Sequence, residues 1–178
     1  MPLFMQRLER KNQYVKNAPY EANEYPIYFY SAALPKDWYY KEEENSVKIF
    51  PEDINGTCMI SIDSDYSEAS NEDYDQLKEV FDEANTEEFW ETLLSSEGDN
   101  IKVSNLKSET VKVGKNKVCK TSFTITDADV NMEMVSYYLW ADNCKTVISS
   151  LRTEDCDYSK EKFDEVTEYI LKSLTYRF

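Results

Sequence analysis

Apolar and polar residues alternate with a period of two through most of the chain, which predicts a structure built mainly from β-strands. The first strand is expected over Tyr25–Ala33, an aromatic-rich run that Pro35 ends because proline cannot donate to a strand ladder. Lys41–Asn45 is expected to be a solvated run of charged residues before a short strand at 46–50. Asn55-Gly56 is typical of a type I′ hairpin turn, since both residues tolerate a positive φ. A strand with one apolar face is expected directly after this turn.

A second group of strands follows the middle of the chain. Only short polar segments separate them, and such connections can join only antiparallel neighbours. In the third of these strands both faces are apolar, so we expect it to be covered on both sides. The first is expected to be broken or bulged around Asn105. The predicted strands are Ile101–Val113, Val118–Thr126, Asn131–Ala141 and Cys144–Leu151.

Two regions have the helical spacing of apolar residues. Asn71–Glu97 carries one apolar stripe on each side of a break expected at Asn85-Thr86, and Gly98 is expected to end it. Ser159–Leu174 is the second helix, with Ser159 or Asp157 as its N-cap. The predicted fold is therefore α+β, a single antiparallel β-sheet meander with helices packed on it.

The chain has 178 residues and a formal net charge of −15, from 35 Asp and Glu against 20 Lys and Arg. Its length fits one domain, and its negative charge repels nucleic acids, which are bound by basic surfaces. We predict a basic N-terminal arm at 1–24 and a single α+β domain at 25–178. The arm either tethers the protein to an acidic partner or folds back on its own acidic body. Its basic residues are Arg7, Arg10, Lys11 and Lys16.

The first 20 residues contain no apolar stretch long enough for a secretory signal, and no run in the chain is long enough to span a membrane. The expected location is the cytoplasm if the chain is complete, and outside it if a leader has been removed.

Composition argues against an enzyme. The chain has no histidine and only 3 glycines, so it lacks both the usual proton shuttle at neutral pH and a glycine-rich phosphate loop. Its cysteines form no Cys-x-x-Cys pair, which argues against a zinc or redox site. They are expected to be buried thiols, with one or two disulfides as the alternative. We expect no catalytic residues and no cofactor. The cysteines are Cys58, Cys119, Cys144 and Cys156.

Asp63, Asp65 and Glu68 begin the densest acidic stretch and are the candidate ligands for a cation such as calcium. The stretch departs from the EF-hand pattern, because Glu68 stands where that loop needs glycine and Tyr74 where it needs glutamate. The alternative is a solvated loop whose acids favour the N-terminus of the following helix.

The order of elements resembles the Mog1/PsbP-like fold. The similar features are the Leu34–Trp38 corner, the Asn55-Gly56 hairpin, the helix from Asn71 and the C-terminal Ile170–Phe178 segment. Asp37 stands where the corner of that fold has glycine. Members include proteins that bind a small GTPase, stabilise photosystem II or act as secretion chaperones. The resemblance implies an adaptor rather than a catalyst, and no functional residue is carried over from it.

Aromatic residues crowd the start of the predicted domain, and exposed tyrosines are common in recognition surfaces. Some of them are expected to form a partner site, while others enter the core or lie beneath the arm or a helix. We predict a non-catalytic protein-interaction module of adaptor, chaperone or inhibitor type, whose acidic surface binds a basic protein. The alternative is an acid-lined domain that binds a cation or a small molecule. The predicted partner-binding residues are Tyr28, Tyr30, Tyr39 and Tyr40.

Overall fold

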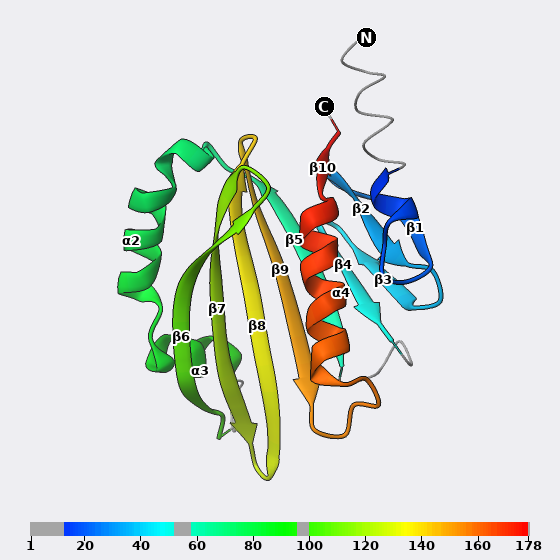
Figure 1. The fold of residues 1–178 in the computed structure, drawn as a ribbon. Helices are drawn as coiled ribbons and strands as arrows, with labels where there is room; N and C mark the ends of the chain where they lie inside the picture. The colour runs from blue at the N-terminus through cyan, green and yellow to red at the C-terminus, as the bar shows by residue number, and fades with distance from the viewer. Residues whose placement is uncertain (1–12, 52–57, 96–99, 178) are drawn as a thin grey trace.

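The computed structural model describes residues 13–51, 58–95 and 100–177. They include two antiparallel sheets and the helices α2, α3 and α4 (Figure 1). The larger sheet has the strand order β3-β4-β5-β9-β8-β7-β6, and the smaller has the order β1-β2-β10. The strands of the larger sheet are β3 (Tyr39–Glu43), β4 (Ser46–Phe50), β5 (Met59–Tyr66), β6 (Lys102–Val113), β7 (Asn116–Asp127), β8 (Val130–Ala141) and β9 (Cys144–Thr153). Those of the smaller sheet are β1 (Ala22–Ile27), β2 (Tyr30–Pro35) and β10 (Thr175–Tyr176).

The α+β class is confirmed, but the prediction of a single sheet is wrong. The predicted strand Tyr25–Ala33 is a hairpin, in which Tyr28 and Phe29 form the turn between β1 and β2. Tyr28 has a φ of +41°, a conformation that is uncommon for a residue with a Cβ. The turn contains no glycine or asparagine, so the sequence carries no local signal for it. Strand β10, from the far end of the chain, pairs with β2 and adds a third strand to this hairpin. The three strands form a sheet of their own.

The charged segment Lys41–Asn45 is exposed, as expected of a solvated run, and most of it belongs to β3. This strand is an edge of the larger sheet, and all its residues except Tyr40 are exposed. Charged side chains on an edge strand oppose pairing with another chain, which explains why a strand can carry them. The Asn55-Gly56 turn lies outside the described residues.

The predicted meander from β6 to β9 is confirmed. β6 is irregular between Ser104 and Lys107, where Asn105 has a φ of +59°, as the sequence indicated. The turn between β8 and β9 consists of Asp142 and Asn143, which both have a positive φ, as a type I′ turn requires.

β8 is covered on both faces, as predicted. Tyr137, Leu139 and Ala141 belong to the main core, whereas Tyr138 and Trp140 belong to a second buried cluster. α4 (Lys160–Ser173) and the small sheet cover the first face, and α2 (Tyr74–Ala84) and α3 (Glu87–Leu94) cover the other (Figure 1). The sheet is therefore the middle layer of the fold.

Local signals set the ends of the helices. The Ser159 hydroxyl accepts from the backbone N–H of Lys162 and caps α4, and the Thr86 hydroxyl caps α3 in the same way. The break between α2 and α3 lies at Asn85-Thr86 as predicted, and Asn85 also accepts a hydrogen bond from the Trp90 indole. Gly98 lies outside the described residues.

Asn71 joins the start of the helical layer to the sheet. It opens a short 3-10 turn (η1, Asn71–Asp73), and its side-chain amide donates to the carbonyls of Lys117 and Trp140 at 2.8 and 3.2 Å. Its side-chain oxygen accepts from the Lys117 N–H at 2.8 Å. One half-buried side chain thus provides hydrogen-bond partners for three backbone groups on β7 and β8.

Asn71→Ala should lower the free energy of unfolding by about 2–3 kcal/mol, because it leaves these backbone groups without a partner. Urea unfolding followed by circular dichroism measures the change. Asn131→Ala removes an exposed asparagine whose side chain accepts one hydrogen bond, from Thr126, and should cost less than about 0.5 kcal/mol. Equal losses for the two variants would show that Asn71 has no special role in joining η1 to the sheet.

Candidate functional site

The structure separates the four tyrosines predicted to bind a partner. Tyr28 and Tyr39 are half exposed, at 50% and 52% of their surface, but Tyr39 begins β3 whereas Tyr28 lies in the β1–β2 turn. Tyr30 is only 3% exposed, and its hydroxyl donates to the Ala141 carbonyl at 3.2 Å. Tyr40 is half-buried, donates to the Pro35 carbonyl, and has its pKa raised to about 12 by burial first and by Asp37 second. Tyr30 is therefore a core residue and not part of an exposed surface.

An aromatic and acidic groove lies between the β1–β2 turn and the β3–β4 turn. Its volume is about 280 Å³. Tyr25 on β1 stacks on Tyr40 of β3, with ring centroids 5.2 Å apart and planes only 4° from parallel. The Tyr25 hydroxyl donates to the Glu42 carboxylate, so this pair holds the two sheets together at the groove. We name it the Tyr28 groove; its lining includes Tyr25, Tyr28, Glu42, Glu43, Glu44, Asn45 and Arg177.

The carboxylates of the groove differ in their surroundings. Glu43 pairs with Lys48 at 2.9 Å and with Lys41 at 3.6 Å, and the hydrogen bond from Lys48 is the main cause that lowers its pKa. Glu44 is exposed and has no ion pair within the described residues. Glu42 accepts a hydrogen bond from the Tyr25 hydroxyl and has no ion pair within the described residues. Glu42 and Glu44 are thus available to a cationic group from outside.

Arg177 forms one wall of the groove and is held by the turn itself. Its backbone N–H donates to the Phe29 carbonyl at 2.8 Å, and its guanidinium donates to the Tyr28 carbonyl at 3.1 Å. Phe29 in turn packs edge-on against the Tyr28 ring, with centroids 4.1 Å apart. These contacts fix the position of the exposed Tyr28.

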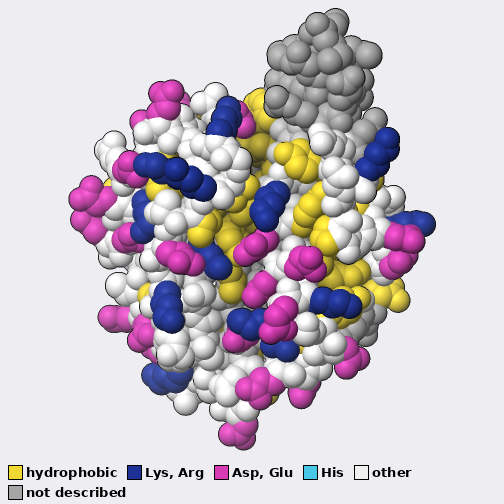
Figure 2. Space-filling model, viewed as in Figure 1, with side chains coloured by type: hydrophobic (Ala, Val, Ile, Leu, Met, Phe, Trp, Pro, Cys, Tyr) yellow, Lys and Arg dark blue, Asp and Glu magenta, His cyan; other side chains and the backbone are white. Residues whose placement is uncertain are grey.

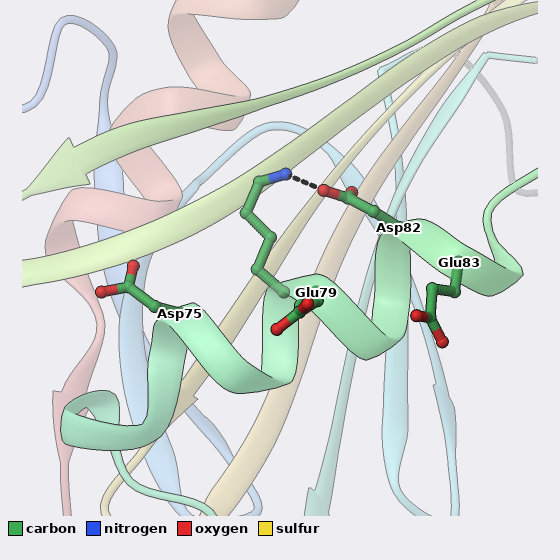
Figure 3. Close-up of a pocket in the computed structure, with 5 residues that line it drawn as sticks. Asp75, Glu79, Asp82 and Glu83 are labelled. Atoms are coloured by element: carbon green, nitrogen blue, oxygen red, sulfur yellow. Dashed lines mark hydrogen bonds and ion pairs between the residues drawn. The ribbon is translucent and has the colours of Figure 1, made fainter.

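A second acidic surface lies on the helices. Residues 71–95 contain nine acidic residues and one lysine, Lys78, which gives them a net charge of −8. Figure 3 shows four of these acids on α2: Lys78 pairs with Asp82, while Glu79 and Glu83 point away from that pair. Asp75 is engaged by Lys117 of β7 at 2.7 Å. A recess of about 600 Å³ lies on this surface, but all five residues that line it are charged, so it lacks the aromatic side chains of the Tyr28 groove.

The three candidate cation ligands lie in different surroundings; they are Asp63, Asp65 and Glu68. Asp63 is half-buried on β5, and burial raises its pKa, which favours the protonated form. Asp65 accepts a hydrogen bond from the Asn45 side chain at 3.1 Å, and Glu68 is exposed after the end of β5. Within residues 13–51, 58–95 and 100–177 no three His, Cys, Asp or Glu side chains are grouped as a metal ion would need.

Cys58, Cys119 and Cys144 are buried free thiols, as the sequence led us to expect, and Cys156 is half-buried. Burial raises the pKa of Cys144 to about 11 and raises that of Cys119 as well. A thiol with a raised pKa is mostly protonated at neutral pH and reacts poorly as a nucleophile.

Sequence reasoning identified Tyr28 but missed the residues that surround it. Tyr25 and Glu42 are 17 positions apart and meet only because β1 folds back at a turn that the sequence does not signal. The one available signal was the run Glu42-Glu43-Glu44 directly before Asn45, which is typical of a turn. No helix among the described residues is long and apolar enough to cross a membrane.

Comparison with known proteins shows similarity at the level of fold. No protein-family model matches the chain, and no curated protein sequence matches it. A crystal structure from Bacteroides thetaiotaomicron VPI-5482 superposes on 88% of this chain with a TM-score of 0.56 and 16% identity. The alignment spans only 48% of that protein, so this chain corresponds to about half of it.

The second similar structure is the solution structure of cyanobacterial PsbP (CyanoP) from Synechocystis sp. PCC 6803. It covers 88% of this chain and 92% of its own, with a TM-score of 0.55 and 12% identity. This confirms the resemblance inferred from the Leu34–Trp38 corner, the helix from Asn71 and the C-terminal segment. The chain has a Mog1/PsbP-like fold.

Proposed function

We propose that this protein is a non-catalytic interaction module that binds a basic segment of a partner protein in the Tyr28 groove. The observation that carries the proposal is the placement of a half-exposed tyrosine beside Glu42 and Glu44. Exposed tyrosines are enriched in recognition surfaces, and carboxylates beside them select a positive charge.

The chemistry of the groove favours arginine over lysine in the partner. A guanidinium can form a bidentate pair with a carboxylate and at the same time stack on an aromatic ring. Both kinds of group are present here, since the Tyr28 ring and the Glu42 and Glu44 carboxylates line the same recess. A compact ammonium group uses the carboxylates but gains less from the ring.

The overall charge supports the same proposal. A net charge of −15 attracts a basic partner from a distance and accelerates its association at low salt. The acidic surface of α2 and α3 contributes most of this field, whereas the groove provides the shape that fixes the partner's position. Attraction therefore comes from the whole molecule and specificity from the groove.

Reversal of the groove charges should weaken binding selectively. Glu42→Lys/Glu44→Lys should reduce the affinity for a fluorescein-labelled Arg-Gly repeat peptide about tenfold or more, because two carboxylates that pair with the peptide are replaced by cations. Fluorescence anisotropy in 50 mM and 300 mM salt measures this affinity. Glu79→Lys/Glu83→Lys on α2 makes the same change in net charge and should weaken binding less than about threefold. Equal effects of the two double variants would contradict recognition in the groove.

Removal of the exposed ring should have a smaller effect in the same direction. Tyr28→Ala should weaken peptide binding about fivefold, as loss of one cation–π contact of about 1 kcal/mol predicts, while Tyr28→Phe should stay close to the wild type. Tyr39→Ala is the matched control, because Tyr39 has nearly the same exposure but lies outside the groove. If a lysine peptide of equal charge binds as tightly as the arginine peptide, the role assigned to the ring is wrong.

A further inference from the structure

A second recess lies at the C-terminal end of α4, away from the Tyr28 groove. The β6–β7 turn, β2, β10 and the end of α4 surround it, and its volume is about 590 Å³. Pockets for small molecules generally measure about 300–1,000 Å³. We name it the α4 crevice.

The floor of the α4 crevice is apolar. Val118 of β7, Leu139 of β8 and Leu171 of α4 line it and are almost fully buried. Leu174 and Val113 are half-buried beside them. In Figure 2, hydrophobic side chains are visible in the upper middle of the face that carries α4, with lysine and arginine side chains near them. Accessible apolar surface in the recess therefore comes from the half-buried Val113 and Leu174, whereas the floor beneath them is almost fully covered.

Tyrosines form part of the wall. Tyr30 and Tyr176 pack edge-on with centroids 5.6 Å apart, and the Tyr30 hydroxyl lies 3.2 Å from the Ala141 carbonyl and 3.3 Å from Asp142. Tyr14, which also lines the recess, is held by the Tyr169 hydroxyl through its backbone carbonyl at 2.7 Å. These contacts give the crevice a fixed shape.

The charge of the crevice differs from that of the protein. Its charged lining residues are Lys115, Lys172 and Asp142, which sum to +1 on a chain of −15. No carboxylate among the described residues forms an ion pair with Lys115 or Lys172. The Tyr28 groove, by contrast, is lined by Glu42, Glu43, Glu44 and Arg177, a sum of −2. The crevice therefore attracts the opposite kind of ligand.

We propose that the α4 crevice binds a small amphipathic carboxylate, with its apolar body against the half-buried Val113, Leu174 and Tyr176 and its carboxylate between Lys115 and Lys172. Burial of an apolar chain against these side chains supplies affinity, and the two ammonium groups select an anionic head. Asp142 does not remove this selectivity, because it is outnumbered by the lysines and lies next to the Tyr30 hydroxyl. This site goes beyond the proposed binding of a basic partner and does not depend on it.

The test uses the fluorescent probe 8-anilinonaphthalene-1-sulfonate on the full chain, with decanoate as competitor below its micellar concentration. Decanoate should displace the probe saturably, and decyltrimethylammonium, which has the same chain with a positive head, should do so at least about fivefold more weakly. The proposal fails if the probe gives no saturable signal or if the two competitors act equally.

Charge variants locate the binding. Lys115→Glu/Lys172→Glu should weaken decanoate binding about tenfold, since it replaces two attractive charges with repulsive ones. The matched control is Lys107→Glu/Lys162→Glu, which makes the same change in net charge at exposed lysines outside the crevice and should weaken it less than about twofold. All four lysines are exposed, and circular dichroism checks that both variants fold. Equal losses in the two variants would place decanoate elsewhere and overturn the proposal.

Discussion

The whole architecture depends on a strand that is apolar on both faces. Tyr137, Leu139 and Ala141 of β8 point to one side and Tyr138 and Trp140 to the other, and all five are buried. An exposed face of this kind would leave several large aromatic side chains in water, at a cost of about 1.5–3 kcal/mol each. The chain must therefore cover the sheet twice, with α4 and the small sheet on one side and α2 and α3 on the other (Figure 1).

This constraint explains where binding surfaces remain. Because the middle of the sheet is covered on both faces, exposed recesses form at the borders between layers. The Tyr28 groove lies where the small sheet meets β3, and the α4 crevice lies where α4 meets the β6–β7 turn. Each recess combines side chains from segments that are distant in sequence, because the layers that meet at a border are formed by different parts of the chain.

The sequence predicted features that depend on neighbouring residues. The Asp142-Asn143 turn, the irregularity at Asn105 and the break at Asn85-Thr86 each follow from the conformational preferences of a few residues. Prediction from the sequence failed where contacts between distant residues determine the structure. The turn at Tyr28 has no local signal and is stabilised by Arg177, 149 positions later, so neither the second sheet nor the burial of Tyr30 could be foreseen. For the same reason the sequence singled out Tyr28 as a candidate residue but not its neighbours Tyr25 and Glu42.

The two recesses are opposite in charge, and this has a consequence for how they operate together. A basic peptide is drawn toward Glu42 and Glu44 but is repelled by Lys115 and Lys172, and a carboxylate experiences the reverse. The two proposed ligands would therefore not compete for one site. Residues of the two recesses are nevertheless adjacent: Tyr30, which lines the α4 crevice, pairs with Tyr176, and the next residue, Arg177, lines the Tyr28 groove. Two short connections join the recesses: the pairing of β2 with β10, and the two-residue step along the chain from Tyr28 in the groove to Tyr30 in the crevice wall.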